Sequence, residues 1–102
     1  MAIPIKLLMT WDIVAGQEDA CFAFITQDLP VTMKQAGLDL TDAWFTAYGG
    51  WPQIRIGFVC PDLDDLERFL ASDPWRNLKS KLLPFAQDYH QKVIVARGGF
   101  QF

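Results

Sequence analysis

The chain has 102 residues, of which 51% are hydrophobic and 14% aromatic, and its formal net charge is −3 at pH 7. This length favours a single domain, residues 1–102, with a single core. The acidic balance argues against the clustered lysines and arginines that bind nucleic-acid phosphates, so no nucleic acid is expected as a partner.

Residues 5–14 alternate between an apolar side and a mixed side, which predicts a β-strand with one buried face. The apolar side carries Ile5, Leu7, Met9, Trp11 and Ile13. The mixed side carries Lys6, Leu8, Thr10, Asp12 and Val14. Gly16 is expected to end this strand.

The next segment predicts a helix that begins near Gln17 and stops at Gly37. Acidic residues occupy its first turn, and apolar residues follow at helical spacing. Pro30 lacks an amide hydrogen and disfavours helical angles at the preceding residue, so a kink is expected there.

The segment DAWFTAYGGWPQIRIGFV, residues 42–59, predicts two strands joined by a hairpin turn. Gly49 and Gly50 accept positive φ without steric cost, and Pro52 is tolerated where the ladder has not yet begun.

Two helical segments follow the hairpin. Asp62 is expected to cap a short helix, and Asp73, with Pro74 at the first helical position, is expected to start another. The apolar stripe of this second helix extends to Tyr89 past a kink at Pro84. The run KVIVAR, residues 92–97, then predicts the last strand.

This order of elements predicts an α+β fold, a ferredoxin-like βαββαβ sandwich. Its four-stranded antiparallel sheet has the order 4-1-3-2, with the helices on one face. The apolar sides of the strands should lie beneath the helices. The mixed face carries several large apolar residues, which a second copy of the chain is expected to cover in a homodimer. They are Leu8, Trp44, Tyr48, Val59 and Ile94.

The element order, the mixed sheet face and the segments DAWFTAYGGWPQIRIGFV and SDPWRNLKSKL resemble the dimeric α+β barrel superfamily. Within it, the whole chain resembles small uncharacterised bacterial ferredoxin-like proteins. The superfamily includes cofactor-free monooxygenases of antibiotic biosynthesis, haem-degrading enzymes, lactone isomerases and stress-responsive proteins with no known reaction. The resemblance therefore implies an architecture and a homodimer rather than one reaction.

No metal and no cofactor are expected. No cluster of His, Cys and carboxylate residues has ligand spacing, and Cys21 and Cys60 are too few for an iron–sulfur cluster and predict buried free thiols. The haem-degrading relatives use an asparagine on the first strand, where this chain has none. His90 is expected near a helix end, in a capping or surface role.

The sequence also favours a location in the cytoplasm. No apolar run approaches the ~20 residues that span a bilayer, and the start MAIPIKLLMTWD lacks a basic leader, so no contact with a membrane is expected.

Arg55 is the centre of the candidate site. If Val14 pairs with Gln53, then Asp12 lies opposite Arg55 and Thr10 opposite Gly57, with Trp44 or Thr46 beside the arginine. In one interpretation, Asp12 and Arg55 form an ion pair stacked by Trp44 inside the dimer interface.

In the other interpretation, a gap over Gly57 accepts a small anionic or aromatic ligand. The gap would be lined by Thr10, Trp44, Tyr48 and Arg55. A small-molecule-binding homodimer is then the favoured function. The alternatives are a cofactor-independent monooxygenase acting on an aromatic substrate, and a structural or stress-responsive protein without catalytic activity.

Overall fold

Four antiparallel strands form one sheet in the order β2-β3-β1-β4. The structure is a computed structural model, and it describes residues 4–46 and 52–95. The strands are β1 (Ile5–Ile13), β2 (Asp39–Phe45), β3 (Ile54–Cys60) and β4 (Ala86–Val95). The predicted strand order and the ferredoxin-like α+β class are confirmed.

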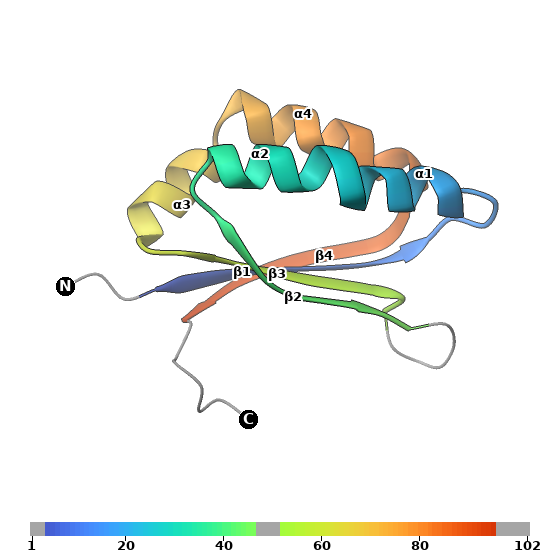
Figure 1. The fold of residues 1–102 in the computed structure, drawn as a ribbon, viewed down its shortest axis with the longest axis horizontal. Helices are drawn as coiled ribbons and strands as arrows, with labels where there is room; N and C mark the ends of the chain where they lie inside the picture. Colours follow the sequence, from blue (N-terminus) through green and yellow to red (C-terminus); the bar gives the residue numbers. More distant parts are fainter. Residues whose placement is uncertain (1–3, 47–51, 96–102) are drawn as a thin grey trace.

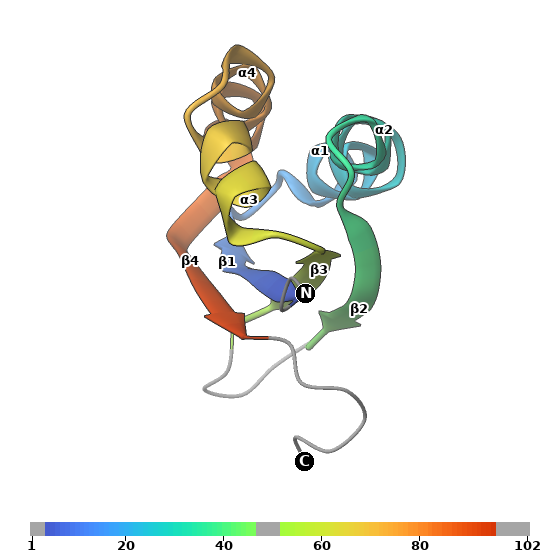
Figure 2. The same ribbon diagram turned by 90° about the vertical axis from the view of Figure 1, so that its left-hand side faces the viewer.

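The helices form a single layer on one face of this sheet (Figure 1). They are α1 (Glu18–Ala23), the π-helical turn η1 (Phe24–Asp28), α2 (Leu29–Gln35), α3 (Leu63–Leu70), α4 (Asp73–Leu82) and the 3-10 turn η2 (Leu83–Phe85). Figure 2 shows that none of these helices lies on the other face. In the part of the chain that the structure describes, no helix has the length and hydrophobicity needed to cross a bilayer.

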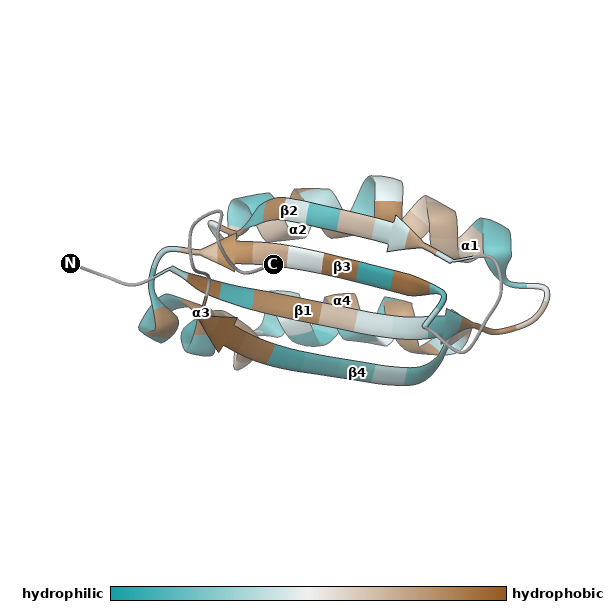
Figure 3. Cartoon of the chain, turned by 90° about the horizontal axis from the view of Figure 1, so that it is seen from below, coloured by the Kyte–Doolittle hydropathy of each residue, from teal (hydrophilic) through white to brown (hydrophobic). Residues whose placement is uncertain are grey.

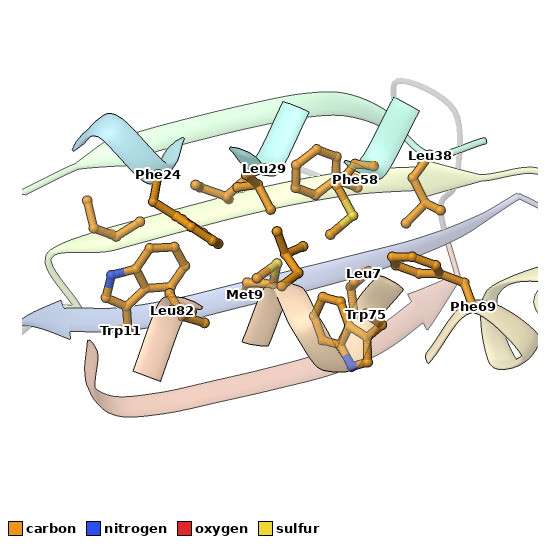
Figure 4. Close-up of a cluster of buried hydrophobic side chains, with 14 of the residues drawn as sticks. Leu7, Met9, Trp11, Phe24, Leu29, Leu38, Phe58, Phe69, Trp75 and Leu82 are labelled. Carbon is orange, nitrogen blue, oxygen red and sulfur yellow. The ribbon is translucent and has the colours of Figure 1, made fainter. Parts of the chain in front are cut away.

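The core lies between the sheet and the helices, where the strand alternation predicted it. Leu7, Met9 and Trp11 of β1 are fully buried (Figure 4). Helical residues close over them, among them Phe24, Leu29, Met33, Leu66, Trp75, Leu78 and Leu82. Cys21 and Cys60 are buried free thiols, as predicted.

Four residues on the helix side of the sheet, Ala43 of β2 among them, are less buried than predicted. Val93 and Val95 are exposed because they lie on the edge strand β4. Phe45, on the edge strand β2, is also exposed, although its ring packs edge-on against Phe22 at 5.4 Å between ring centroids.

The first helix runs without a gap from Glu18 to Gln35, and its middle part, η1, is π-helical. Pro30 has no amide hydrogen to donate to the carbonyl four residues earlier, and η1 ends two residues before it. The helix ends as predicted at Gly37, which has φ 85°. Leu38 N donates to Met33 O at 2.9 Å and Gly37 N to Lys34 O at 3.0 Å, which closes a Schellman motif.

Replacing Gly37 with alanine should lower the free energy of unfolding by about 1 kcal/mol, because a Cβ disfavours the left-handed conformation. A Cβ at this position would meet no atom within 4 Å, so the backbone alone accounts for the loss. Urea denaturation measures it. Gly37→Asn is the control and should cost less, because asparagine tolerates this conformation better. Equal losses for both variants would contradict this explanation.

The last helix and strand have different limits from those predicted. Ser72, rather than Asp73, caps α4, because its Oγ accepts a hydrogen bond from Trp75 N at 3.4 Å. Helix α4 ends at Leu82, and β4 begins at Ala86, six residues before the predicted start. Pro84 therefore ends the helix instead of bending it, and Tyr89 and His90 belong to a strand.

Strand β4 also carries a bulge near its start. Thr10 pairs with His90 but Asp12 pairs with Gln87, so the ladder gains one extra residue opposite Trp11. Asp88 lies in this bulge with φ 53°, a conformation that aspartate adopts more readily than most residues.

Candidate functional site

The sheet surface turned away from the helices, called the open face here, is organised in rows that cross the strands. One row joins His90, Thr10, Arg55 and Trp44, since Thr10 pairs with both His90 and Arg55, and Arg55 pairs with Trp44. We call these four residues the site row. Figure 3 views the sheet from the side of the open face and shows β4 hydrophilic along most of its length and hydrophobic at its C-terminal end.

The predicted pairing of Asp12 with Arg55 is wrong, because β1 and β3 pair two residues out of the predicted register. Thr10, and not Asp12, lies opposite Arg55. Asp12 Oδ1 instead accepts a hydrogen bond from Gln53 N at 3.0 Å, and Gln53 Oε1 accepts one from Ile13 N at 2.7 Å. This exchange holds the ends of β1 and β3 together and fixes the register.

The space over Gly57 is filled, so the predicted gap is not there. Leu8 and Asp42 flank Gly57 on the neighbouring strands. Lys6 Nζ lies 2.8 Å from Asp42 Oδ1, and a Cβ at Gly57 would collide with both side chains. Burial raises the pKa of Asp42, but hydrogen bonds from Lys6 and Thr41 and the charges of Lys6 and Arg55 outweigh it and lower the pKa.

A groove of about 690 Å³ does lie on the open face, displaced from Gly57 to the site row. Its lining consists of Leu8, Thr10, Trp44, Thr46, Pro52, Arg55, His90, Gln91 and Lys92. Arg55 and Lys92 are cationic, and none of the lining residues is acidic. A chain with a net charge of −3 thus presents a positively charged groove.

Arg55 and Trp44 lie side by side, as predicted, without the predicted stacking. Within residues 4–46 and 52–95, no carboxylate oxygen lies within 4.0 Å of the Arg55 guanidinium. Over the same residues, the Trp44 ring has no aromatic partner and no cation above it. Trp44 is 64% exposed.

The structure thus brings together Thr10, Trp44 and Arg55 of the predicted site and leaves Asp12 outside the groove lining. Tyr48 lies outside the described residues. Lys92 lies on the open face, where its place in the predicted strand 92–97 put it, but it was not among the predicted site residues, and His90 was expected near a helix end. His90 continues the alternation of Lys92 and Ile94 and would have been placed on the open face had the strand been extended back. Among the described residues, no three His, Cys, Asp or Glu side chains are placed to hold a metal ion.

No family model and no curated protein matches the chain significantly. Solved structures match over nearly its whole length. An uncharacterised NIPSNAP-like domain protein from Burkholderia xenovorans is 14% identical with a TM-score of 0.70, and the match covers 97% of this chain and 90% of that one.

Two further structures are similar. A candidate antibiotic biosynthesis monooxygenase from Caulobacter crescentus is 12% identical with a TM-score of 0.69, covering 94% of this chain and 92% of that one. A dimeric protein of unknown function and ferredoxin-like fold from Bacteroides fragilis is 9% identical with a TM-score of 0.69, covering 91% and 96%. At these identities the likeness establishes a shared ferredoxin-like fold and leaves the activity open.

The two interpretations of Arg55 differ in what a substitution does to stability. A buried Asp12–Arg55 pair would make Arg55→Ala cost about 3–5 kcal/mol. With Arg55 exposed, we expect Arg55→Met to change the free energy of unfolding by less than about 0.5 kcal/mol. Asp12→Ala should cost about 1–2 kcal/mol, because it removes the acceptor for Gln53 N. Denaturation of both variants at one protein concentration tests this, and a larger loss for Arg55→Met than for Asp12→Ala would contradict it.

Proposed function

We propose that the chain is a small-molecule-binding homodimer, in which the open faces of two copies pack against each other and enclose the groove. The observation that carries the proposal is the groove itself, which is lined by Arg55 and Lys92 and by no acidic residue. Its volume of about 690 Å³ falls within the range of about 300–1,000 Å³ typical of small-molecule sites. The ligand is therefore a small anion.

Three observations support the dimer. The described helices cover only one face of the sheet. Trp44 is 64% exposed and Ile94 40% exposed on the open face, whereas Leu8 is already buried and Val59 half-buried within one chain. The Bacteroides fragilis protein of the same fold is dimeric. Sheets packed face to face about 10 Å apart would cover Trp44 and Ile94 and leave the groove as an internal cavity.

Thermal unfolding in the presence of small anions tests the ligand class. A ligand that binds the folded protein raises the melting temperature in proportion to the logarithm of its concentration above Kd. We expect carboxylates to raise the melting temperature of the wild type and their neutral amides to have no effect. Arg55→Met should remove the response without lowering the melting temperature of the free protein. A panel in which no anion raises the melting temperature would contradict the proposal.

A second candidate is a cofactor-independent monooxygenase acting on an aromatic substrate. The candidate monooxygenase from Caulobacter crescentus shares the fold, and the groove places Trp44 and His90 in one row. Substrate-dependent oxygen uptake by the purified protein, without added cofactor, would support this activity. A protein that neither consumes oxygen nor responds to ligands would fit the third alternative, a structural or stress-responsive role.

A further inference from the structure

We propose that the ligand of the groove is a planar aromatic carboxylate, with its carboxylate on Arg55 and Thr10 and its ring on Trp44. This inference rests on the proposed function, that the groove binds a small anion, and it names the chemical class and the orientation of the ligand. It follows from the order of residues along the site row.

The first step concerns the donors of Arg55. The charge of Arg55 lowers the pKa of Asp42, but the Asp42 carboxylate already has two other partners. It accepts hydrogen bonds from Lys6 Nζ at 2.8 Å and from Thr41 Oγ1 at 2.8 Å. The guanidinium of Arg55 is exposed and, among the described residues, not paired with a carboxylate. A guanidinium offers two parallel N–H donors that match the two oxygens of a carboxylate.

The second step concerns the position of the ring. Trp44 lies directly opposite Arg55 on the next strand, and such cross-strand neighbours have Cβ atoms about 4.5–5.5 Å apart. A carboxylate bound to Arg55 therefore brings a directly attached ring next to the indole. Stacking on an aromatic partner adds to the gain from burying the ring surface. A long flexible linker between ring and carboxylate would carry the ring past Trp44.

The third step distinguishes a carboxylate from phosphate. Phosphate sites draw on backbone N–H groups at helix N-termini and in loops. Thr10 and Arg55 lie in a sheet whose strands pair on both sides of them, and the sheet ladder takes up such backbone donors. Side chains alone therefore bind the ligand, and the buried Leu8 supplies an apolar wall. This combination of few donors, an indole and an apolar wall favours an aromatic acid over inorganic phosphate.

Titration calorimetry with 2-naphthoate tests the proposal. Three probes accompany it: 2-naphthamide, which has the ring without the charge, cyclohexanecarboxylate, which has the charge without the aromatic ring, and inorganic phosphate. We expect 2-naphthoate to bind at least about tenfold more tightly than each of the other three, a difference of about 1.4 kcal/mol. The mass of each variant in solution is measured in parallel to show that it assembles as the wild type does.

Two variants test the orientation. Arg55→Met should abolish the preference for 2-naphthoate over 2-naphthamide. Trp44→Leu should weaken 2-naphthoate and leave cyclohexanecarboxylate unchanged. Arg76→Met is the matched control, because Arg76 lies on α4 and pairs with Asp73 away from the groove. It should bind 2-naphthoate as the wild type does.

The outcomes separate this inference from the proposed function. If cyclohexanecarboxylate or phosphate binds as tightly as 2-naphthoate, and Arg55→Met abolishes that binding, the groove is an anion site but the aromatic assignment is wrong. If Trp44→Leu leaves 2-naphthoate binding unchanged, the ring does not lie on Trp44 and the proposed orientation is wrong. If none of the three anions binds, the proposed function fails together with the inference.

Discussion

Replacing Trp11 with alanine is expected to lower the free energy of unfolding by about 3–5 kcal/mol. Trp11 is 0% exposed in the core, with its ring centroid 6.2 Å from that of Tyr89 and its side chain close to Phe24 and Leu82 (Figure 4). Removing the indole leaves a cavity. The sheet cannot move to fill this cavity, because β1 is paired with a strand on each side. Denaturation followed by circular dichroism measures the loss, which is a large fraction of the ~5–15 kcal/mol typical of a folded domain.

Trp11→Phe is the control for this prediction. It keeps an aromatic ring and removes the indole N–H, which has no hydrogen-bond partner of normal geometry among the described residues. Burial raises the pKa of the neighbouring Cys21 thiol, and the Trp11 side chain lowers it by less. We expect Trp11→Phe to cost about 1–2 kcal/mol. If Trp11→Phe and Trp11→Ala lowered the free energy of unfolding by similar amounts, the stability of the core would not depend on the volume of the ring.

Placing glutamates at Trp44 and Ile94 together is expected to convert the proposed dimer into a monomer. Both residues lie on the open face, where their side chains are the large exposed apolar groups on β2 and β4. In a two-fold symmetric interface each substitution occurs twice, so four carboxylates would lose their hydration. We expect the dissociation constant to rise at least about 100-fold, which size-exclusion chromatography with light scattering would detect.

Val31→Glu is the matched control for the glutamate variant. Val31 lies on α2, in the helical layer, and is likewise exposed. It should leave the mass in solution unchanged, because the proposed interface does not include that surface. A double variant that remains a dimer, or a Val31→Glu variant that dissociates, would place the interface elsewhere.

The sequence alone was sufficient to predict which face of each central strand is buried. Side chains alternate with a period of two, so Leu7, Met9 and Trp11 of β1 had to share a face, and a slip of one residue would have turned all of them towards solvent. The same period explains the error at Asp12 and Arg55. A shift of two residues leaves every side chain on the same face of the sheet. The hydrophobic pattern therefore cannot distinguish the predicted register from the observed one.

Contacts distant in sequence set the true register. Asp12 Oδ1 accepts a hydrogen bond from Gln53 N, and Gln53 Oε1 accepts one from Ile13 N, so each bond joins residues at least 40 positions apart in the sequence. Lys6 forms an ion pair with Asp42 over Gly57. These contacts require side-chain lengths and positions that no local pattern specifies. The missing side chain at Gly57 leaves room for the ion pair of Lys6 and Asp42, and not for the expected ligand.

His90 was misplaced because two patterns competed for the same residues. The spacing of Leu78, Leu82 and Tyr89 fits a helix, and Tyr89 does face the core, where burial raises its pKa and Lys79 Nζ lies 4.8 Å from its ring centroid. The polar residues from Gln87 to His90 show no alternation that would indicate a strand. The bulge at Asp88 disturbs the alternation at this point.

Sedimentation equilibrium of the wild-type chain at micromolar concentration tests whether a second copy covers the open face and encloses the groove. We expect one species with twice the 11.6 kDa mass of the chain. A specific interface of at least ~1,200 Å² would keep that species intact on dilution through the micromolar range. A species with the mass of one chain throughout that range would contradict it.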